Sequence, residues 1–371
     1  MKRELECVEI PGEHEARERT WAVVQAAYAE REPVPHRSPL PRVAAVAVAL
    51  AALGAVALSS PGRAVLDGIR EVVGVERAQT ALFSLPAPGS LLVASDAGIW
   101  VVQQDGSKRL LGAYREASWS PLGRFVVAVR ANELAALEPD GKVRWTLARP
   151  GARSPAWTGT EIDTRIAYVD RTGIRVVAGD GTNDRLLVPG GRGPLAWRPG
   201  AGFVLAYAAR GRVRVVDAET GELRWQAARP PGAATALEWS SDGRRLLVLS
   251  PHHVRVYDAA GNVVEQEDPS EGWPDVAATF RPHSHEAAVA RVHGSQSTAY
   301  VLGGRTLFNG TGAFGDLAWS PDGRWLLVTW TTADQWVFVR ADGKRIRAVS
   351  NVAEQFRSRS SPRVEGWCCA R

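Results

Sequence analysis

Histidine and cysteine are the residues of this 371-residue chain whose positions suggest metal or redox chemistry. Five of its seven histidines fall between positions 252 and 293, and imidazoles are usual zinc ligands. Two of its three cysteines, Cys368 and Cys369, are adjacent, so on a strand their side chains would point to opposite faces, and a disulfide between them would be strained. We expect these cysteines to have a structural or incidental role rather than a catalytic one.

The motifs of several enzyme classes are missing from the sequence. It contains no G-x-S-x-G nucleophile elbow, no phosphate-binding P-loop and no H-E-x-x-H zinc motif. Asp-Gly pairs such as Asp180-Gly181 offer oxygen ligands, but their spacing is not that of a calcium loop and a hairpin turn explains them. We therefore predict a non-enzymatic protein with no catalytic, cofactor-binding or metal-binding residues.

One phrase recurs along the chain at intervals of 38 to 42 residues. The clearest copies read Trp-Ser-Pro-Leu-Gly-Arg at 119–124, Trp-Ser-Ser-Asp-Gly-Arg at 239–244 and Trp-Ser-Pro-Asp-Gly-Arg at 319–324, each before an apolar run. A large ring at the same place in each repeat is explained by packing between neighbouring repeats, which accounts for many of the 14 tryptophans. The repeat anchors are Trp119, Trp157, Trp197, Trp239, Phe280 and Trp319.

A second pattern keeps the same interval. Segments that alternate polar and apolar residues meet at a pair of turn residues, most often Asp-Gly, which is a strong signal for a β-hairpin. A period near 40 residues built from short strands and tight turns predicts an all-β fold, the β-propeller, in which each repeat forms a four-stranded blade. The turn glycines are Gly106, Gly141, Gly181, Gly221, Gly261, Gly304 and Gly343.

The Trp-Ser-Pro-Asp-Gly-Arg phrase and its apolar run resemble the repeat of the TolB-like, WD40-like (PD40) propellers of bacterial envelopes. The resemblance covers about residues 80–350, although the Gly-His and Trp-Asp dipeptides of eukaryotic WD40 repeats are missing. It implies a scaffold that binds partner proteins, and it implies no chemistry. An enzyme with its site in the central channel is the alternative, because propellers host many functions.

The number of blades follows from the length of the repeat region. Residues 79–371 accommodate close to seven repeats, and six is the alternative because TolB resembles a six-bladed ring. We place Leu85 at the tryptophan position of the first blade, which would end near Leu111. The segment 363–369, which contains Trp367, reads as one more strand that would pair with this blade and close the ring.

This arrangement separates the histidines. His283 and His285 would lie in the turn after an inner strand, whereas His252, His253 and His293 would lie in the next kind of turn, on the opposite face of the ring. We therefore expect solvated loop histidines rather than a zinc site.

A membrane anchor is predicted ahead of the propeller. Residues 43–62 carry no charge, and as a helix they would extend about 30 Å, which matches the hydrocarbon core of a bilayer. We predict a single transmembrane helix here, with a cleaved signal peptide or a buried soluble helix as alternatives. Residues 63–78 predict a short amphipathic helix at the membrane surface.

Residues 1–42 form a tail in which Trp21, Val24 and Tyr28 share one stripe of a predicted helix. Such a helix is marginal in water alone, so we expect the stripe to bind a partner, with a weakly ordered tail as the alternative. The tail has a net charge of −1 and the whole chain +5, so the remaining residues carry +6, which suits an anionic envelope better than nucleic acid.

The predicted protein is therefore a single-pass cell-membrane protein with a cytoplasmic N-terminus and an extracytoplasmic propeller that binds a protein or cell-envelope ligand. Flanking arginines do not decide the orientation, which rests on the short length of the tail. The alternative is a transmembrane signalling regulator whose N-terminal helix binds a cytoplasmic factor, as in membrane-bound anti-sigma factors, although the H-x-x-x-C-x-x-C motif of many of these is absent.

Overall fold

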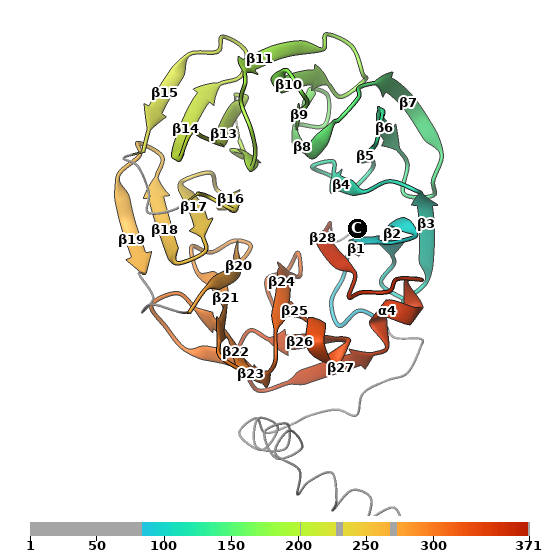
Figure 1. Ribbon diagram of the computed structural model, residues 1–371, viewed down its shortest axis with the longest axis vertical. Helices are drawn as coiled ribbons and strands as arrows, with labels where there is room; N and C mark the ends of the chain where they lie inside the picture. The colour runs from blue at the N-terminus through green and yellow to red at the C-terminus, as the bar shows by residue number, and fades with distance from the viewer. Residues whose placement is uncertain (1–83, 201, 228–232, 268–272, 370–371) are drawn as a thin grey trace, which may run out of the picture. The chain divides into compact units, whose positions relative to one another are not determined.

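The computed structural model describes residues 84–200, 202–227, 233–267 and 273–369. Over these residues the strands form seven four-stranded antiparallel sheets that follow one another around a ring (Figure 1). The fold is a seven-bladed β-propeller, so the predicted all-β class is confirmed and the six-bladed alternative is wrong.

The blades succeed each other in chain order, and each runs from an inner strand to an outer one. Blade 1 contains β28 (Arg363–Cys368), β1 (Ser90–Ser95), β2 (Gly98–Val102) and β3 (Lys108–Gly112). Blade 2 contains β4 (Glu116–Trp119), β5 (Val126–Arg130), β6 (Glu133–Leu137) and β7 (Val143–Ala148). Blade 3 contains β8 (Arg153–Gly159), β9 (Thr164–Val169), β10 (Gly173–Ala178) and β11 (Arg185–Pro189).

The second half of the ring repeats this order. Blade 4 contains β12 (Leu195–Trp197), β13 (Val204–Ala209), β14 (Arg212–Asp217) and β15 (Leu223–Gln226), and blade 5 contains β16 (Ala236–Trp239), β17 (Arg245–Ser250), β18 (His253–Asp258) and β19 (Val263–Glu267). Blade 6 contains β20 (Asp275–Phe280), β21 (Ala287–His293), β22 (Gln296–Val301) and β23 (Thr306–Thr311). Blade 7 contains β24 (Phe314–Trp319), β25 (Trp325–Trp330), β26 (Gln335–Arg340) and β27 (Ile346–Ser350), with the short helices η1 (Thr331–Ala333) and α4 (Val352–Gln355).

Strand alternation gives the ring two faces with different loops. The turns after the inner strands and the Asp-Gly turns between the third and fourth strands share one face, which we call the upper face. The turns between the second and third strands and the connections between blades share the other, the lower face. The second strands are almost wholly buried, as in β25, because both sides of each sheet pack against neighbouring blades.

Ring closure joins the two ends of the described chain. Strand β28 pairs antiparallel with β1, and Trp367 lies opposite Leu91 just as Trp119 lies opposite Val126 in blade 2. The predicted closure is therefore confirmed. The placement of Leu85 at the tryptophan position is wrong, because Trp367 already occupies that position from the C-terminal end of the chain. Leu85 precedes the first strand and is buried in the cluster that contains Trp367.

The repeated aromatic residues occupy one position of the inner strands and pack between blades. The rings of Trp197, Trp239, Phe280, Trp319 and Trp367 are buried, whereas those of Trp119 and Trp157 are half-buried. An arginine strengthens two of these junctions. The Arg281 guanidinium donates a 2.7 Å hydrogen bond to Gly323 O in the next blade and lies 5.6 Å from the Trp319 ring.

Several predictions concern residues 1–83 and lie outside the described residues. They are the tail helix with Trp21, Val24 and Tyr28, the span 43–62 and the helix 63–78. Among the residues that are described, no helix has both the length and the apolar character needed to cross a membrane.

Candidate functional site

A hollow of about 630 Å³ opens on the upper face between blades 2 and 3. The rings of Phe125 and Trp157 stack in it with centroids 6.2 Å apart and planes 16° from parallel. Phe125 is held by the turn after β4, where its N–H donates a 2.9 Å hydrogen bond to Ser120 Oγ, and Trp157 lies on β8 of the next blade. The two rings meet only because neighbouring blades pack together.

Exposed apolar side chains surround this aromatic pair. Eight large hydrophobic side chains are exposed over the described residues, and three of them line this one hollow. They are Leu122 at 48%, Val143 at 48% and Ile162 at 96%. Grouped apolar side chains of this kind mark a contact surface rather than a core, so we call this region the aromatic hollow.

Charged residues ring the aromatic hollow. Arg124 forms a 2.6 Å ion pair with Glu161 across the two blades, and Arg144 lies 3.1 Å from Glu138 and 5.8 Å from the Phe125 ring. Lys142 adds a third cation. The cations at the mouth therefore outnumber the carboxylates that line it, Glu161 and Asp180.

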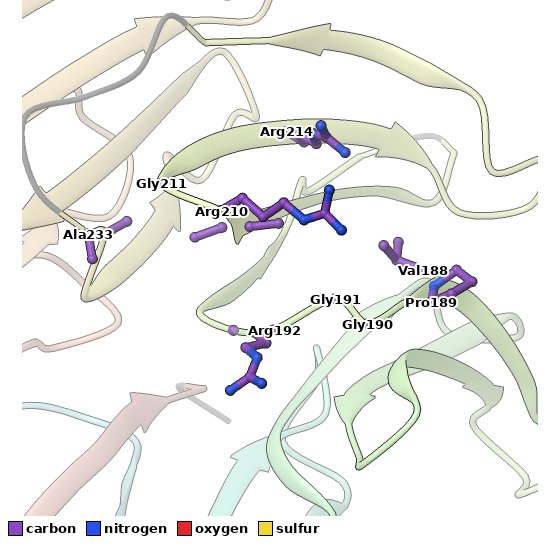
Figure 2. A pocket seen from close by; sticks show the side chains of 13 residues that line it. Val188, Pro189, Gly190, Gly191, Arg192, Arg210, Gly211, Arg214 and Ala233 are labelled. Carbon is purple, nitrogen blue, oxygen red and sulfur yellow. The ribbon is translucent and has the colours of Figure 1, made fainter.

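A second hollow, of about 590 Å³, lies on the lower face and is lined by residues of blades 3, 4 and 5 (Figure 2). Its wall includes the glycine-rich connection 190–193 and the hairpin turn between β13 and β14. Arg192, Arg210 and Arg214 line it, and none of the described residues in its lining is a carboxylate. We call it the arginine hollow.

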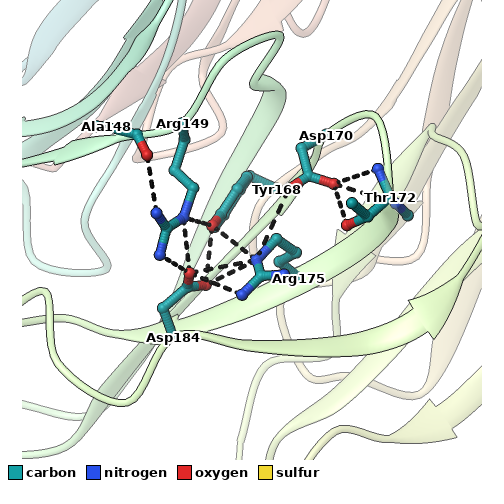
Figure 3. A network of polar contacts seen from close by, with 8 residues as sticks. Ala148, Arg149, Tyr168, Asp170, Thr172, Arg175 and Asp184 are labelled. Atoms are coloured by element: carbon teal, nitrogen blue, oxygen red, sulfur yellow. Dashed lines mark hydrogen bonds and ion pairs between the residues drawn. The ribbon is translucent and has the colours of Figure 1, made fainter.

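A buried polar network joins blades 2 and 3 near the aromatic hollow (Figure 3). Asp184, whose side chain is 6% exposed, accepts hydrogen bonds from Arg149 of blade 2 and from Arg175 and Tyr168 of blade 3. Burial opposes the charged form of Asp184, but these hydrogen bonds prevail and lower its pKa. Burial and the bond to Asp184 raise the pKa of Tyr168 to about 12, so the network is an ion-paired structural contact.

Carboxylates on the inner strands form a different repeated contact. The inner strand of a propeller has a free edge toward the centre, and several of its N–H groups bond to an acid of the preceding blade. Asp316 accepts from Val364 N at 2.9 Å, Glu116 accepts from Ser154 N, and Glu238 accepts from Phe280 N at 3.2 Å. Burial raises the pKa of Glu238 to about 7 against these opposing hydrogen bonds.

The fourth such acid, Glu365 of β28, accepts a backbone hydrogen bond from Ala117 of blade 2. Burial and the nearby carboxylates Glu116 and Asp316 raise its pKa to about 7, while Arg363, 3.0 Å away, acts in the opposite direction. Sequence reasoning missed these acids, because their partners are backbone groups of the neighbouring blade.

The histidines are distributed as the sequence predicted. His283 and His285 lie in the turn between β20 and β21, and His252, His253 and His293 lie around second-to-third-strand turns on the other face. His285 Nε2 lies 2.8 Å from Asp242 Oδ2 of the preceding blade. Within the described part of the chain, no three His, Cys, Asp or Glu side chains are grouped so as to hold a metal ion.

Cys368 and Cys369 form a disulfide with each other at the end of β28. Cys369 also lies against the upper-face turn of blade 2, with its Sγ 3.7 Å from Pro121 O. The pair therefore sits where the closing strand meets the next blade.

Comparison with known proteins adds no relative. No protein-family model matches the chain, and no curated protein matches it. The fold itself defines the class: a seven-bladed repeat propeller, an architecture compatible with a protein-interaction module.

Proposed function

We propose that this chain is a non-enzymatic, membrane-anchored binding protein whose extracytoplasmic propeller, related to the TolB-like and PD40 repeats, holds a protein partner in the aromatic hollow. The observation that carries the proposal is the grouping of exposed Leu122, Val143 and Ile162 around the stacked rings of Phe125 and Trp157. Isolated exposed apolar residues are ordinary on proteins, but three around one aromatic pair are not.

The surroundings define the chemistry of the partner. Apolar contact area of this kind accepts an aliphatic or aromatic anchor side chain, which is how most interfaces gain their binding energy. The excess of cations at the mouth, from Arg124, Lys142 and Arg144, favours a carboxylate next to that anchor. The expected partner segment therefore carries an apolar residue flanked by acidic ones.

Site-specific photo-cross-linking tests this proposal in cells that make the full chain. A photoreactive amino acid replaces Ile162 in one variant and Val264, which is 44% exposed on blade 5, in the control. We expect a discrete protein adduct from position 162, none from position 264, and loss of the adduct when Leu122→Asp is added. Identical adducts from both positions, or an adduct unaffected by Leu122→Asp, would refute the aromatic hollow as the binding site.

The proposed location rests on other observations. The uncharged segment 43–62 supports an anchor, and the Cys368–Cys369 disulfide supports an oxidising compartment outside the cytoplasm. A reporter that fluoresces only in the cytoplasm should be silent when fused after Arg371, whereas a bright fusion contradicts this topology. The signalling-regulator alternative differs in the tail, and binding of a regulatory protein that is lost on Trp21→Ala would favour it.

A further inference from the structure

The arginine hollow on the lower face lacks the partners that arginines elsewhere in the ring have. In the described part of the chain, Arg192 and Arg210 make no side-chain hydrogen bond and no ion pair, and both are exposed. Arg214 is half-buried and uses only its Nε, which donates a 2.8 Å hydrogen bond to Gln226 Oε1. Three positive charges therefore line one cavity that no described carboxylate neutralises.

The backbone at Arg210 is an independent sign of function. Arg210 and Gly211 form the two-residue turn between β13 and β14, with φ of 51° and 71°. Both positions of this turn require the left-handed region, where Asn-Gly is favoured and a long side chain is disfavoured. The fold alone would favour asparagine at this position, so the arginine is explained by its charge at the hollow rather than by the turn.

The opposite wall contributes backbone donors. The connection Gly190-Gly191-Arg192-Gly193 has little side-chain bulk, which lets a ligand approach the main chain closely. The N–H groups of Gly190 and Gly191 bond to Thr172 O and Val188 O, but among the described backbone hydrogen bonds those of Arg192 and Gly193 have no acceptor. Arg210 and Arg214 project side by side across the hollow from this connection (Figure 2).

We propose that the arginine hollow binds a phosphate ester. Forked guanidinium groups on one wall and free N–H groups on the other suit an anion with several oxygens, and the dianionic charge of a phosphate monoester matches the unneutralised cations. A volume of about 590 Å³ leaves room for the organic part of the ester. The ester is either a soluble molecule or the headgroup of a phospholipid. This site is separate from the aromatic hollow, which lies on the other face.

Calorimetric titration of the full chain in phosphatidylcholine nanodiscs tests the site, with glycerol 3-phosphate and short-chain phosphatidic acid as probes. The test variant is Arg192→Ala combined with Arg210→Asn. Because asparagine suits the turn, Arg210→Asn removes the charge while preserving the hairpin. The matched controls are Arg212→Ala, on the same hairpin but outside the hollow, and Arg345→Ala, exposed on the upper face.

We expect saturable binding to the wild type and both controls, and affinity at least 10-fold weaker in the double variant. Comparable affinity for both probes identifies a soluble ester as sufficient, whereas binding of phosphatidic acid alone identifies a lipid headgroup. The absence of saturable binding to either probe overturns the proposal. So does an equal loss in the Arg212→Ala control, because that result would reflect net charge and not this cavity.

Discussion

Trp367 lies opposite Leu91, which joins the last strand of the propeller to its first. The two residues are separated by almost the whole described chain, yet their pairing has the same register as the local pair Trp119 and Val126. Strand β28 thereby removes the open edge that blade 1 would otherwise present toward the centre. The ring is complete only when both ends of its sequence are present.

Removal of the closing strand should therefore destabilise the whole domain. Truncation of residues 360–371 should unfold or oligomerise the propeller, and Trp367→Ala should lower its stability by about 3–5 kcal/mol, because the ring is buried against Phe338. Chemical denaturation and size-exclusion chromatography measure both effects. Leu223→Ala, at a side chain 51% exposed on β15, serves as the control and should change little. An unchanged melting curve after truncation would show that β28 does not close the ring.

The network around Asp184 should contribute strongly to the contact between blades 2 and 3. Asp184→Asn leaves Arg149 and Arg175 without their anion, and we expect a loss of about 2–3 kcal/mol in the free energy of unfolding at pH 7. Asp163→Asn is the matched control, since Asp163 pairs with Arg165 but is 56% exposed and should contribute less than about 1 kcal/mol. Equal effects of the two substitutions at pH 7 would contradict the structural role of the network.

The two Asp184 proteins should also converge in acid. The pKa of Asp184 is lowered in the folded state, so its contribution is present above the unfolded-state pKa and is lost as pH falls through the folded-state value. Denaturation from pH 7 to pH 3 should show the difference between wild type and Asp184→Asn shrinking. A difference that grows in acid would reverse the assigned sign.

Glu238 should have the opposite pH dependence. Its pKa is raised to about 7 from 4.5, so the unfolded chain releases this proton first and stability falls as pH rises from about 4.5 to 7. Glu238→Gln removes this titration, and its stability relative to wild type should increase over that range by about 1–3 kcal/mol, since one pKa unit corresponds to about 1.4 kcal/mol. Denaturation of both proteins at a series of pH values measures the difference, and a constant difference would rule out a raised pKa.

Much of the fold could be predicted from the sequence because its signals are local. The recurring Trp-Ser-Pro-Asp-Gly-Arg phrase forms a turn whose serine side chain accepts the N–H five residues later, as Ser320 does from Trp325. The Asp-Gly turns, such as Asp180-Gly181, place glycine at positive φ between two paired strands. Interactions within a few residues specify these features, so they can be read without knowledge of the rest of the chain.

The candidate sites could not be predicted in the same way. Phe125 and Trp157 lie in different repeats and meet only where two blades pack, and Arg192 and Arg210 belong to loops that surround one cavity only in the closed ring. The error at Leu85 has the same origin, since the strand that replaces it comes from the far end of the chain. The sequence alone determined the repeat, the turns and the alternation of the strands, because these depend on near neighbours. Only the tertiary structure decided which side chains face each other, because contacts between blades join residues that no short-range pattern relates.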